Sequence, residues 1–250
     1  MMWLGKLLAA VLVGLVMALP ARAEGPACGA LPEALEAGPM PGVAAAVARG
    51  NLRVMIVGSA STQGGGTSGP QATWPERFAR LLRERLERVN VDVLTLGGRG
   101  MVAADHARLI AEQAPAQRPH LVIWQLGTVE AARGLSADDM TDVVKSTAAR
   151  IRVARGERTD VVLMDPQFSR FLRSNADVEL YRDRLRLAAG ASGAQMFSRW
   201  DIMKNWSETE RLDLERAPRE LRTRVADELH DCIARALVEF VMDGVAQARR

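Results

Sequence analysis

The sequence predicts an α/β protein built on a parallel sheet of about five strands. Five short apolar runs alternate with longer segments whose apolar residues recur at helical spacing. Alternation of this kind implies helices on both faces of a parallel sheet, which makes three layers. The length of 250 residues and the 48% share of hydrophobic residues suit one domain of about 200 residues behind a leader.

The predicted strands contain few polar residues, as expected of strands that are buried on both faces. They span residues 52–57, 91–96, 121–126, 160–164 and 194–197. In most of the predicted helices, apolar residues lie three and four positions apart and so share one face. These helices span residues 43–48, 74–89, 101–113, 138–154, 177–189 and 226–246.

The first residues predict an export signal rather than part of the fold. Lys6 precedes an apolar stretch at 7–19, and Ala21-Arg22-Ala23 forms a small-x-small cleavage site. The apolar stretch is shorter than the roughly 20 residues that a membrane span needs, although an uncleaved anchor is the alternative. We expect a periplasmic or secreted protein, cleaved after Ala23. A signal peptide, an N-terminal strap and the folded domain then occupy residues 1–23, 24–50 and 51–250.

Export also bears on the two cysteines, Cys28 and Cys232. An oxidising compartment favours a disulfide between them, which would tie the strap to the last predicted helix. Closing a loop of about 200 residues contributes about 4–5 kcal/mol in the chain-entropy model. The alternative is lipidation of Cys28, but Gly25-Pro26-Ala27 is a poor recognition sequence for it.

Composition argues against several kinds of partner. The net charge of +3 is scattered along the chain without a basic run, so we expect no nucleic-acid partner. Only three histidines, His106, His120 and His230, could join the two cysteines as zinc ligands, so a zinc site is unlikely. The Gly/Ser-rich loop after the first strand lacks the spacing and the lysine of nucleotide-binding motifs. We therefore expect neither a metal nor a cofactor.

Four short blocks follow the strands or precede the last helix, and we expect them to form the site. Ligands of parallel sheets bind beyond the carboxyl ends of the strands, where the first three blocks lie. The blocks are Gly58-Ser59-Ala60-Ser61-Thr62, Gly97-Gly98-Arg99-Gly100, Gly127-Thr128-Val129-Glu130 and Asp227-Glu228-Leu229-His230.

In this order the blocks resemble those of the SGNH, or GDSL, hydrolase superfamily. They are most similar to an exported bacterial branch with a Gly-Ser-Ser-Ser-Thr first block, which residues 163–168 and 197–200 and the two cysteines also resemble. The resemblance covers almost the whole mature chain and implies a flavodoxin-like α/β/α sandwich with an ester-cleaving ancestry. In that superfamily a first-block serine attacks an acyl carbonyl, and an Asp-x-x-His pair supplies the base. A glycine and an asparagine help to stabilise the oxyanion.

This chain departs from the family pattern at two positions. The nucleophile position is Ala60, and the oxyanion asparagine position is Val129, whereas Gly100 matches the oxyanion glycine. Ser59 and Ser61 flank Ala60, but a shift of one position moves the hydroxyl too far for efficient attack. We interpret both serines as turn hydroxyls that bond the local backbone.

The Asp-x-x-His pair leaves two alignments open. Asp227 and His230 match the pattern in residue type and spacing. If Cys232 is instead aligned with the family's cysteine, the catalytic pair falls near Leu221 and Arg224 and is lost. In that alignment His230 is a first-turn helix residue beside the disulfide.

Two functions remain open. The sequence favours a pseudoenzyme that serves as a periplasmic binding or accessory protein for an acylated or polysaccharide-like ligand. The alternative is an active or weakly active ester hydrolase that uses Ser59 or Ser61 with His230. We interpret His106 as a solvent-edge helix residue, and Trp200 and Trp206 as packing residues or, alternatively, as a platform for sugars.

Overall fold

The computed structural model describes residues 28–152 and 158–250. It contains one parallel sheet with the strand order β2-β1-β3-β4-β5. The observed architecture confirms the predicted fold class. The strands are β1 (Asn51–Gly58), β2 (Asn90–Gly97), β3 (Leu121–Gln125), β4 (Asp160–Met164) and β5 (Gln195–Phe197).

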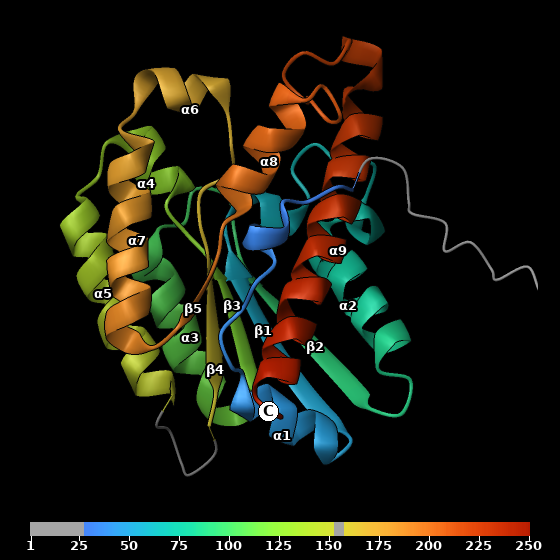
Figure 1. Ribbon diagram of the computed structural model, residues 1–250. Coiled ribbons are helices and arrows are strands. Elements are labelled where there is room, and N and C mark those ends of the chain that lie inside the picture. Colours follow the sequence, from blue (N-terminus) through green and yellow to red (C-terminus); the bar gives the residue numbers. More distant parts are fainter. Residues whose placement is uncertain (1–27, 153–157) are drawn as a thin grey trace, which may run out of the picture.

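Helices cover both faces of the sheet (Figure 1). One layer consists of α1 (Pro41–Ala48), α2 (Trp74–Arg85) and α9 (Arg222–Gln247). The other consists of α3 (Ala103–Gln117), α5 (Ala137–Arg152) and α7 (Val178–Ser192). Shorter helices lie beyond the carboxyl ends of the strands: α4 (Thr128–Arg133), α6 (Arg170–Asn175) and α8 (Arg199–Glu208). Single 3-10 turns are η1 (Pro32–Ala34), η2 (Ala60–Gln63), η3 (Pro70–Ala72) and η5 (Arg219–Leu221).

Apolar burial and side-chain caps explain why these segments adopt these structures. The three central strands β1, β3 and β4 are almost entirely buried, and Ile56, Trp124 and Leu163 have no exposed surface. The edge strands β2 and β5 are partly exposed. Several helices begin at a capping side chain; for example, Thr73 accepts the Glu76 N–H at the start of α2, and Asp177 accepts the Leu180 N–H at the start of α7. The sheet is therefore a rigid platform for the loops at its ends.

The sequence predicted every strand to within one residue at each end, but it missed α4, α6 and α8. These helices have six to ten residues, too few turns for a clear apolar stripe. The last helix begins at Arg222 rather than at 226, so His230 lies in its third turn. The prediction of a first-turn position for His230 is therefore wrong.

The strap is fixed to the domain by covalent and polar contacts. Cys28 and Cys232 form a disulfide, which confirms the predicted pairing. The Trp206 Nε1–H donates to the Gly29 carbonyl at 3.0 Å, which joins the strap to α8. The predicted signal peptide lies outside the described residues. Within the described part, the chain forms no helix that is both long enough and apolar enough to cross a membrane.

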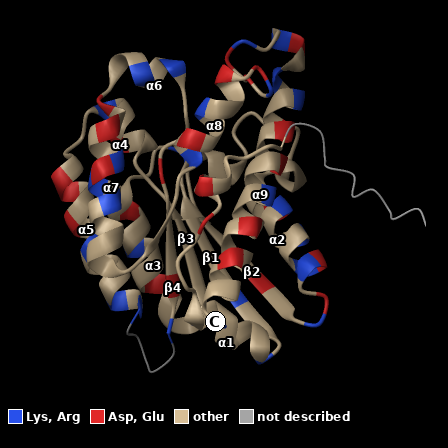
Figure 2. Ribbon diagram, viewed as in Figure 1, with Lys and Arg blue, Asp and Glu red and all other residues tan. Residues whose placement is uncertain are grey.

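Charged residues of both signs are interspersed over the outer helices (Figure 2). The strands carry mostly uncharged residues in the same view. Several of the charged side chains that the fold buries, Glu130, Asp165 and Arg199, lie beyond the carboxyl ends of the strands, whereas Asp160 lies at the amino end of β4.

Candidate functional site

The first and second blocks lie side by side because β1 and β2 end in a pair of glycines. Gly58 is opposite Gly97 in the strand register. At Gly97, with φ +122°, a Cβ atom would lie 1.8 Å from the Gly58 carbonyl oxygen, so only glycine fits there. This close approach brings the loop that contains Ala60 next to the loop that contains Gly100.

Ser59 and Ser61 are bridged by the side chain of Gln125, at the end of β3. The Ser61 hydroxyl donates to Gln125 Oε1 at 2.6 Å, and Gln125 Nε2 donates to Ser59 Oγ at 3.4 Å. The interpretation of both serines as hydroxyls that bond the local backbone is therefore wrong, because a polar side chain on the neighbouring strand competes for them. An amide oxygen is not a base, so this arrangement does not activate Ser61 as a nucleophile.

The positions that match the family's nucleophile and oxyanion donors lie in these loops. Ala60 is the half-buried first residue of η2, and Val129 is half-buried in α4. Gly100 has φ +78°, and Arg133 Nη2 lies 2.7 Å from the place of a Cβ atom at that residue. Neither Ala60 nor Val129 carries a side-chain donor or nucleophile, and their assignment to the catalytic positions stays a prediction.

His230 is buried, and one of its ring nitrogens is already occupied. Its Nδ1 atom accepts the backbone N–H of Trp74 at 2.9 Å. The pKa of His230 is lowered to about 4, mainly by burial and also by the positive charges of Arg199 and Arg77, against the opposing effect of Asp227. A neutral imidazole has one donor and one acceptor nitrogen, so Nε2 carries the proton. His230 thus has no free lone pair with which to accept a proton from a serine.

Asp227 does not orient this imidazole. Its Oδ1 atom accepts the backbone N–H of Ser68 at 2.9 Å, and the acceptor role of His230 Nδ1 leaves no N–H there for a carboxylate. The structure therefore places Asp227 and His230 on one helix beside the first loop, but it does not assemble them with a serine into a catalytic triad.

Arg199, which the sequence analysis did not single out as a site residue, lies between the loops. It is the first residue of α8 and is only 2% exposed. Its Nη1 donates to Ser61 Oγ at 3.2 Å and its Nη2 to Thr128 Oγ1 at 3.4 Å. Burial lowers its pKa to about 10, with Asp165 opposing, so the side chain remains a cation at neutral pH. Its Nε has no hydrogen-bond partner among the described residues.

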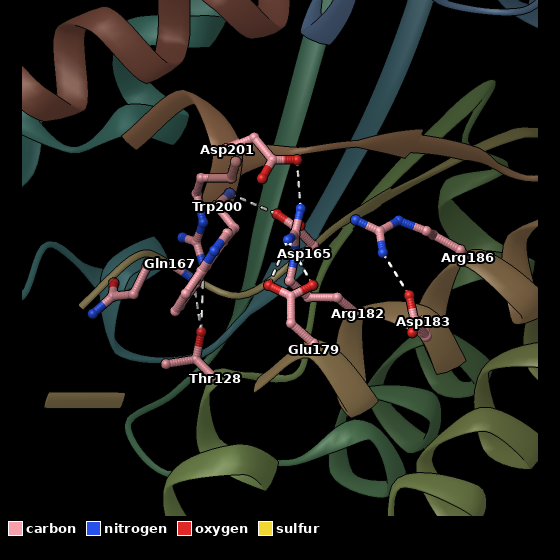
Figure 3. A network of polar contacts seen from close by, with 10 residues as sticks. Thr128, Asp165, Gln167, Glu179, Arg182, Asp183, Arg186, Trp200 and Asp201 are labelled. Carbon is pink, nitrogen blue, oxygen red and sulfur yellow. Dashed lines mark hydrogen bonds and ion pairs between the residues drawn. The ribbon is translucent and has the colours of Figure 1, made fainter. Parts of the chain in front are cut away.

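A buried ion pair holds the start of α8 in place (Figure 3). Asp165 follows β4 and has no exposed surface. It accepts the Trp200 N–H at 2.8 Å and Arg182 Nε–H at 2.9 Å. Burial raises the pKa of Asp165 to about 6, while Arg182 and the Trp200 N–H oppose the shift. The structure therefore places this carboxylate in a packing network that positions Arg199.

Two more titratable side chains are buried beneath the loops. Glu130 accepts the backbone N–H groups of Ala103 and Gly127, at 2.7 and 3.1 Å, and burial raises its pKa. It therefore joins the third block to the start of α3. His106 is 1% exposed, and burial lowers its pKa to about 4, so its interpretation as a solvent-edge residue is wrong. Ala103 precedes it by three positions and Ile110 follows it by four, and this apolar spacing was the available signal of burial.

Trp200 and Trp206 are also buried, which confirms their interpretation as packing residues. Gln125 and Arg199 were missed as site residues. A polar residue that ends a fully apolar strand was the available signal for Gln125. For Arg199 the only signal was a charge between Phe197 and Trp200.

The sheet order and these loops define the class of protein: an α/β fold that matches the SGNH hydrolases. The chain belongs to the non-GDSL lipase-like family, whose sequence profile matches residues 27–247. No curated relative matches the chain in sequence.

Several solved structures share the fold at low sequence identity. The α/β hydrolase LAE5, from the metagenome of Lake Arreo, Spain, is 15% identical with a TM-score of 0.60, over 79% of this chain and 96% of its own. A mutant of Axe2, an acetyl-xylooligosaccharide esterase from Geobacillus, is 15% identical with a TM-score of 0.58, over 76% of this chain and 94% of its own. CEX, a two-domain esterase active on acetylated mannans, is 12% identical with a TM-score of 0.67, over 86% of this chain and 56% of its own.

Proposed function

We propose that this protein is a non-hydrolytic member of its family that binds an acylated, polysaccharide-like ligand at the carboxyl end of the sheet. In this role it is a periplasmic binding or accessory protein. The observation that carries the proposal is the hydrogen bond from the Trp74 N–H to His230 Nδ1. It uses the lone pair that a catalytic histidine needs for the proton of its serine.

Other groups at the site support the same conclusion. A serine nucleophile needs a base to remove its proton, and the oxyanion needs preorganised donors that are each worth about 3–4 kcal/mol. Ala60 has no hydroxyl, and Val129 has no donor. The cationic guanidinium of Arg199 further disfavours the imidazolium that His230 would become during acyl transfer.

The same groups suit binding without reaction. Ser61 and Thr128 carry half-buried hydroxyls that both accept from Arg199, and Ser61 follows Ala60 in the chain. Hydroxyls and a guanidinium are suitable hydrogen-bond partners for sugar hydroxyls and acyl carbonyls. Among the structural relatives, Axe2 and CEX are described as esterases of acetylated glycans, which supports an acetylated oligosaccharide as the first ligand to test.

The test measures binding and acetate release on one ligand. Calorimetry with an acetylated xylo-oligosaccharide is expected to show saturable binding, while an acetate assay on the same mixture shows no release above buffer. Ala60→Phe, which places a bulky side chain between the first and second loops, should abolish binding. Ala191→Phe, at an exposed position near the end of α7, is the matched control and should not.

A second variant tests the missing base directly. The double variant Ala60→Ser with Val129→Asn restores the nucleophile and the oxyanion donor but leaves the Nδ1 lone pair of His230 occupied. It is expected to remain inactive on p-nitrophenyl acetate. Turnover by this variant would show that Asp227 and His230 are catalytically competent. A fluorophosphonate adduct on Ser59 or Ser61 of the unchanged protein would favour the alternative, an active ester hydrolase.

A further inference from the structure

A second candidate site lies at the opposite, amino end of the sheet. A pocket of about 410 Å³ opens between the last turns of α3 and α5, a size within the roughly 300–1,000 Å³ range of small-molecule sites. Its inner wall includes the buried residues Ile110, Ile151 and Thr147, and its mouth includes the exposed residues Arg118 and Arg150. None of these residues belongs to the four blocks.

The end of α3 explains why the two helices leave a space. Pro115 lies inside the helix and has no N–H to donate to the carbonyl of Ala111. The helix then ends at Arg118, which has the left-handed φ of +45°. Pro115 and Arg118 both line the pocket, so the irregular end of α3 forms one of its walls.

Thr147 supplies the observation that points to a ligand. It is 3% exposed and lines the pocket, and its hydroxyl has no hydrogen-bond partner among the described residues. Two other hydroxyls of the same helix bond the backbone within it: Thr141 donates to Ala137 at 2.7 Å, and Ser146 donates to Val143 at 3.1 Å. A buried hydroxyl without a partner costs free energy, which a bound acceptor would recover.

The charges at the mouth indicate the sign of that acceptor. Arg150 Nε donates to the Ser146 carbonyl at 3.3 Å, and no carboxylate of the described chain forms an ion pair with Arg118 or Arg150. Thr147 precedes Arg150 by three residues on α5, so the two side chains lie on neighbouring turns of one face. A carboxylate can therefore accept hydrogen bonds from both.

We propose that this pocket binds an amphipathic carboxylate. The carboxylate bonds the Thr147 hydroxyl and the guanidinium groups of Arg150 and Arg118, and the apolar body lies against Ile110 and Ile151. A fatty acid and an aromatic acid share this chemistry. The proposal is independent of the function proposed for the carboxyl end of the sheet.

The test uses the oxidised, full-length mature protein and calorimetry at low ionic strength. Two probes, decanoate and 1-naphthoate, separate the fatty-acid and aromatic forms of the ligand, and decanol tests the need for charge. We expect saturable binding of at least one acid below 1 mM, an order of magnitude tighter than binding of decanol.

Variants locate the binding. Ala111→Trp, at the exposed mouth, should abolish it, and the double variant Arg118→Gln with Arg150→Gln should weaken it by about tenfold or more. Thr147→Val should weaken it by about three- to tenfold. Arg85→Gln, which removes an exposed arginine from α2 on the other face of the sheet, is the matched control and should have no effect.

Three results would overturn the proposal: no saturable binding of either acid, binding that survives Ala111→Trp, or equal affinity for decanol and decanoate. Failure here is distinguishable from failure of the proposed function, because binding of an acetylated oligosaccharide is measured separately and involves neither arginine.

Discussion

The two ends of the sheet differ in the hydrogen bonding of one hydroxyl each, that of Ser61 at the carboxyl end and that of Thr147 at the amino end. At the carboxyl end, Arg199, Ser61 and Gln125 bond one another across loops that follow three different strands. At the amino end, the buried hydroxyl of Thr147 faces a pocket and has no partner among the described residues. The polar side chains of the carboxyl end hold one another before any ligand binds, whereas the amino end leaves one hydroxyl of the described chain free to bond a ligand.

The carboxyl end therefore corresponds to the family's site, and the amino end is a separate candidate site. The carboxyl end has the loop arrangement of SGNH hydrolases, but its side chains bond one another rather than a reacting group. Polar networks in a low-dielectric interior stabilise strongly when every member is satisfied, and they are costly when one is removed. We therefore expect changes at the carboxyl end to have large effects on stability, and changes at the amino end to have small ones.

The largest effect is expected from Asp165→Ala. It removes a fully buried carboxylate and leaves Arg182, which is 4% exposed, without its innermost partner. Breaking one side of a buried ion pair costs about 3–5 kcal/mol. The change also removes the acceptor of the Trp200 N–H at the start of α8. Urea unfolding of the variant measures the loss.

Asp183→Ala is the matched control, because Asp183 pairs with Arg186 on the same helix at the surface (Figure 3). An exposed pair contributes about 0–1 kcal/mol, so this variant should unfold close to the unchanged protein. If both variants lost the same stability, the distinction between a buried network and ordinary surface charge would fail.

Much of this architecture could be predicted from sequence, and the reason is periodicity. The run 52–57 contains almost only apolar residues and forms β1, because a strand covered on both faces needs them. The disulfide between Cys28 and Cys232 was also predictable, since export and a pair of cysteines favour it.

The candidate site was less predictable, because burial of single polar residues leaves little trace in a sequence. An arginine between Ser198 and Trp200 looks like a surface charge, and arginines are rarely buried. Its burial follows from α8, a short helix without a strong apolar pattern. The acceptor role of His230 Nδ1 depends on Trp74, which is 156 residues away in the sequence. Short-range patterns cannot encode such a contact.

The second largest expected effect is the loss of folding stability at acidic pH. The folded-state pKa of about 4 for His106 and His230 lies below the ordinary 6.5, so the unfolded chain binds protons first as the pH falls. Stability therefore decreases from about pH 6.5 toward pH 4, by about 2 kcal/mol for each histidine at pH 5. Asp165 acts in the opposite direction, because its raised pKa lets the folded protein take up a proton first, and it offsets about 1 kcal/mol. Urea midpoints at pH 7 and pH 5 measure the sum.

His230→Asn isolates one histidine of this pair. The asparagine Oδ1 can accept the Trp74 N–H as Nδ1 does, but it does not titrate. The loss of stability between pH 7 and pH 5 should therefore shrink by about 2 kcal/mol. An unchanged pH dependence would mean that His230 is not held neutral by the packing around it.

The smallest effect distinguishes two threonines on α5. Thr147→Val replaces a buried hydroxyl that has no partner in the described chain, so the variant should be as stable as the unchanged protein or more stable by up to about 1 kcal/mol. Thr141→Val removes a hydroxyl that donates to the Ala137 carbonyl, and it should lose about 1 kcal/mol. Thermal or urea unfolding of the two variants without ligand gives the comparison. A loss at Thr147 equal to that at Thr141 would mean that the Thr147 hydroxyl is already satisfied, and the pocket would then lack the free donor that distinguishes it from the carboxyl end of the sheet.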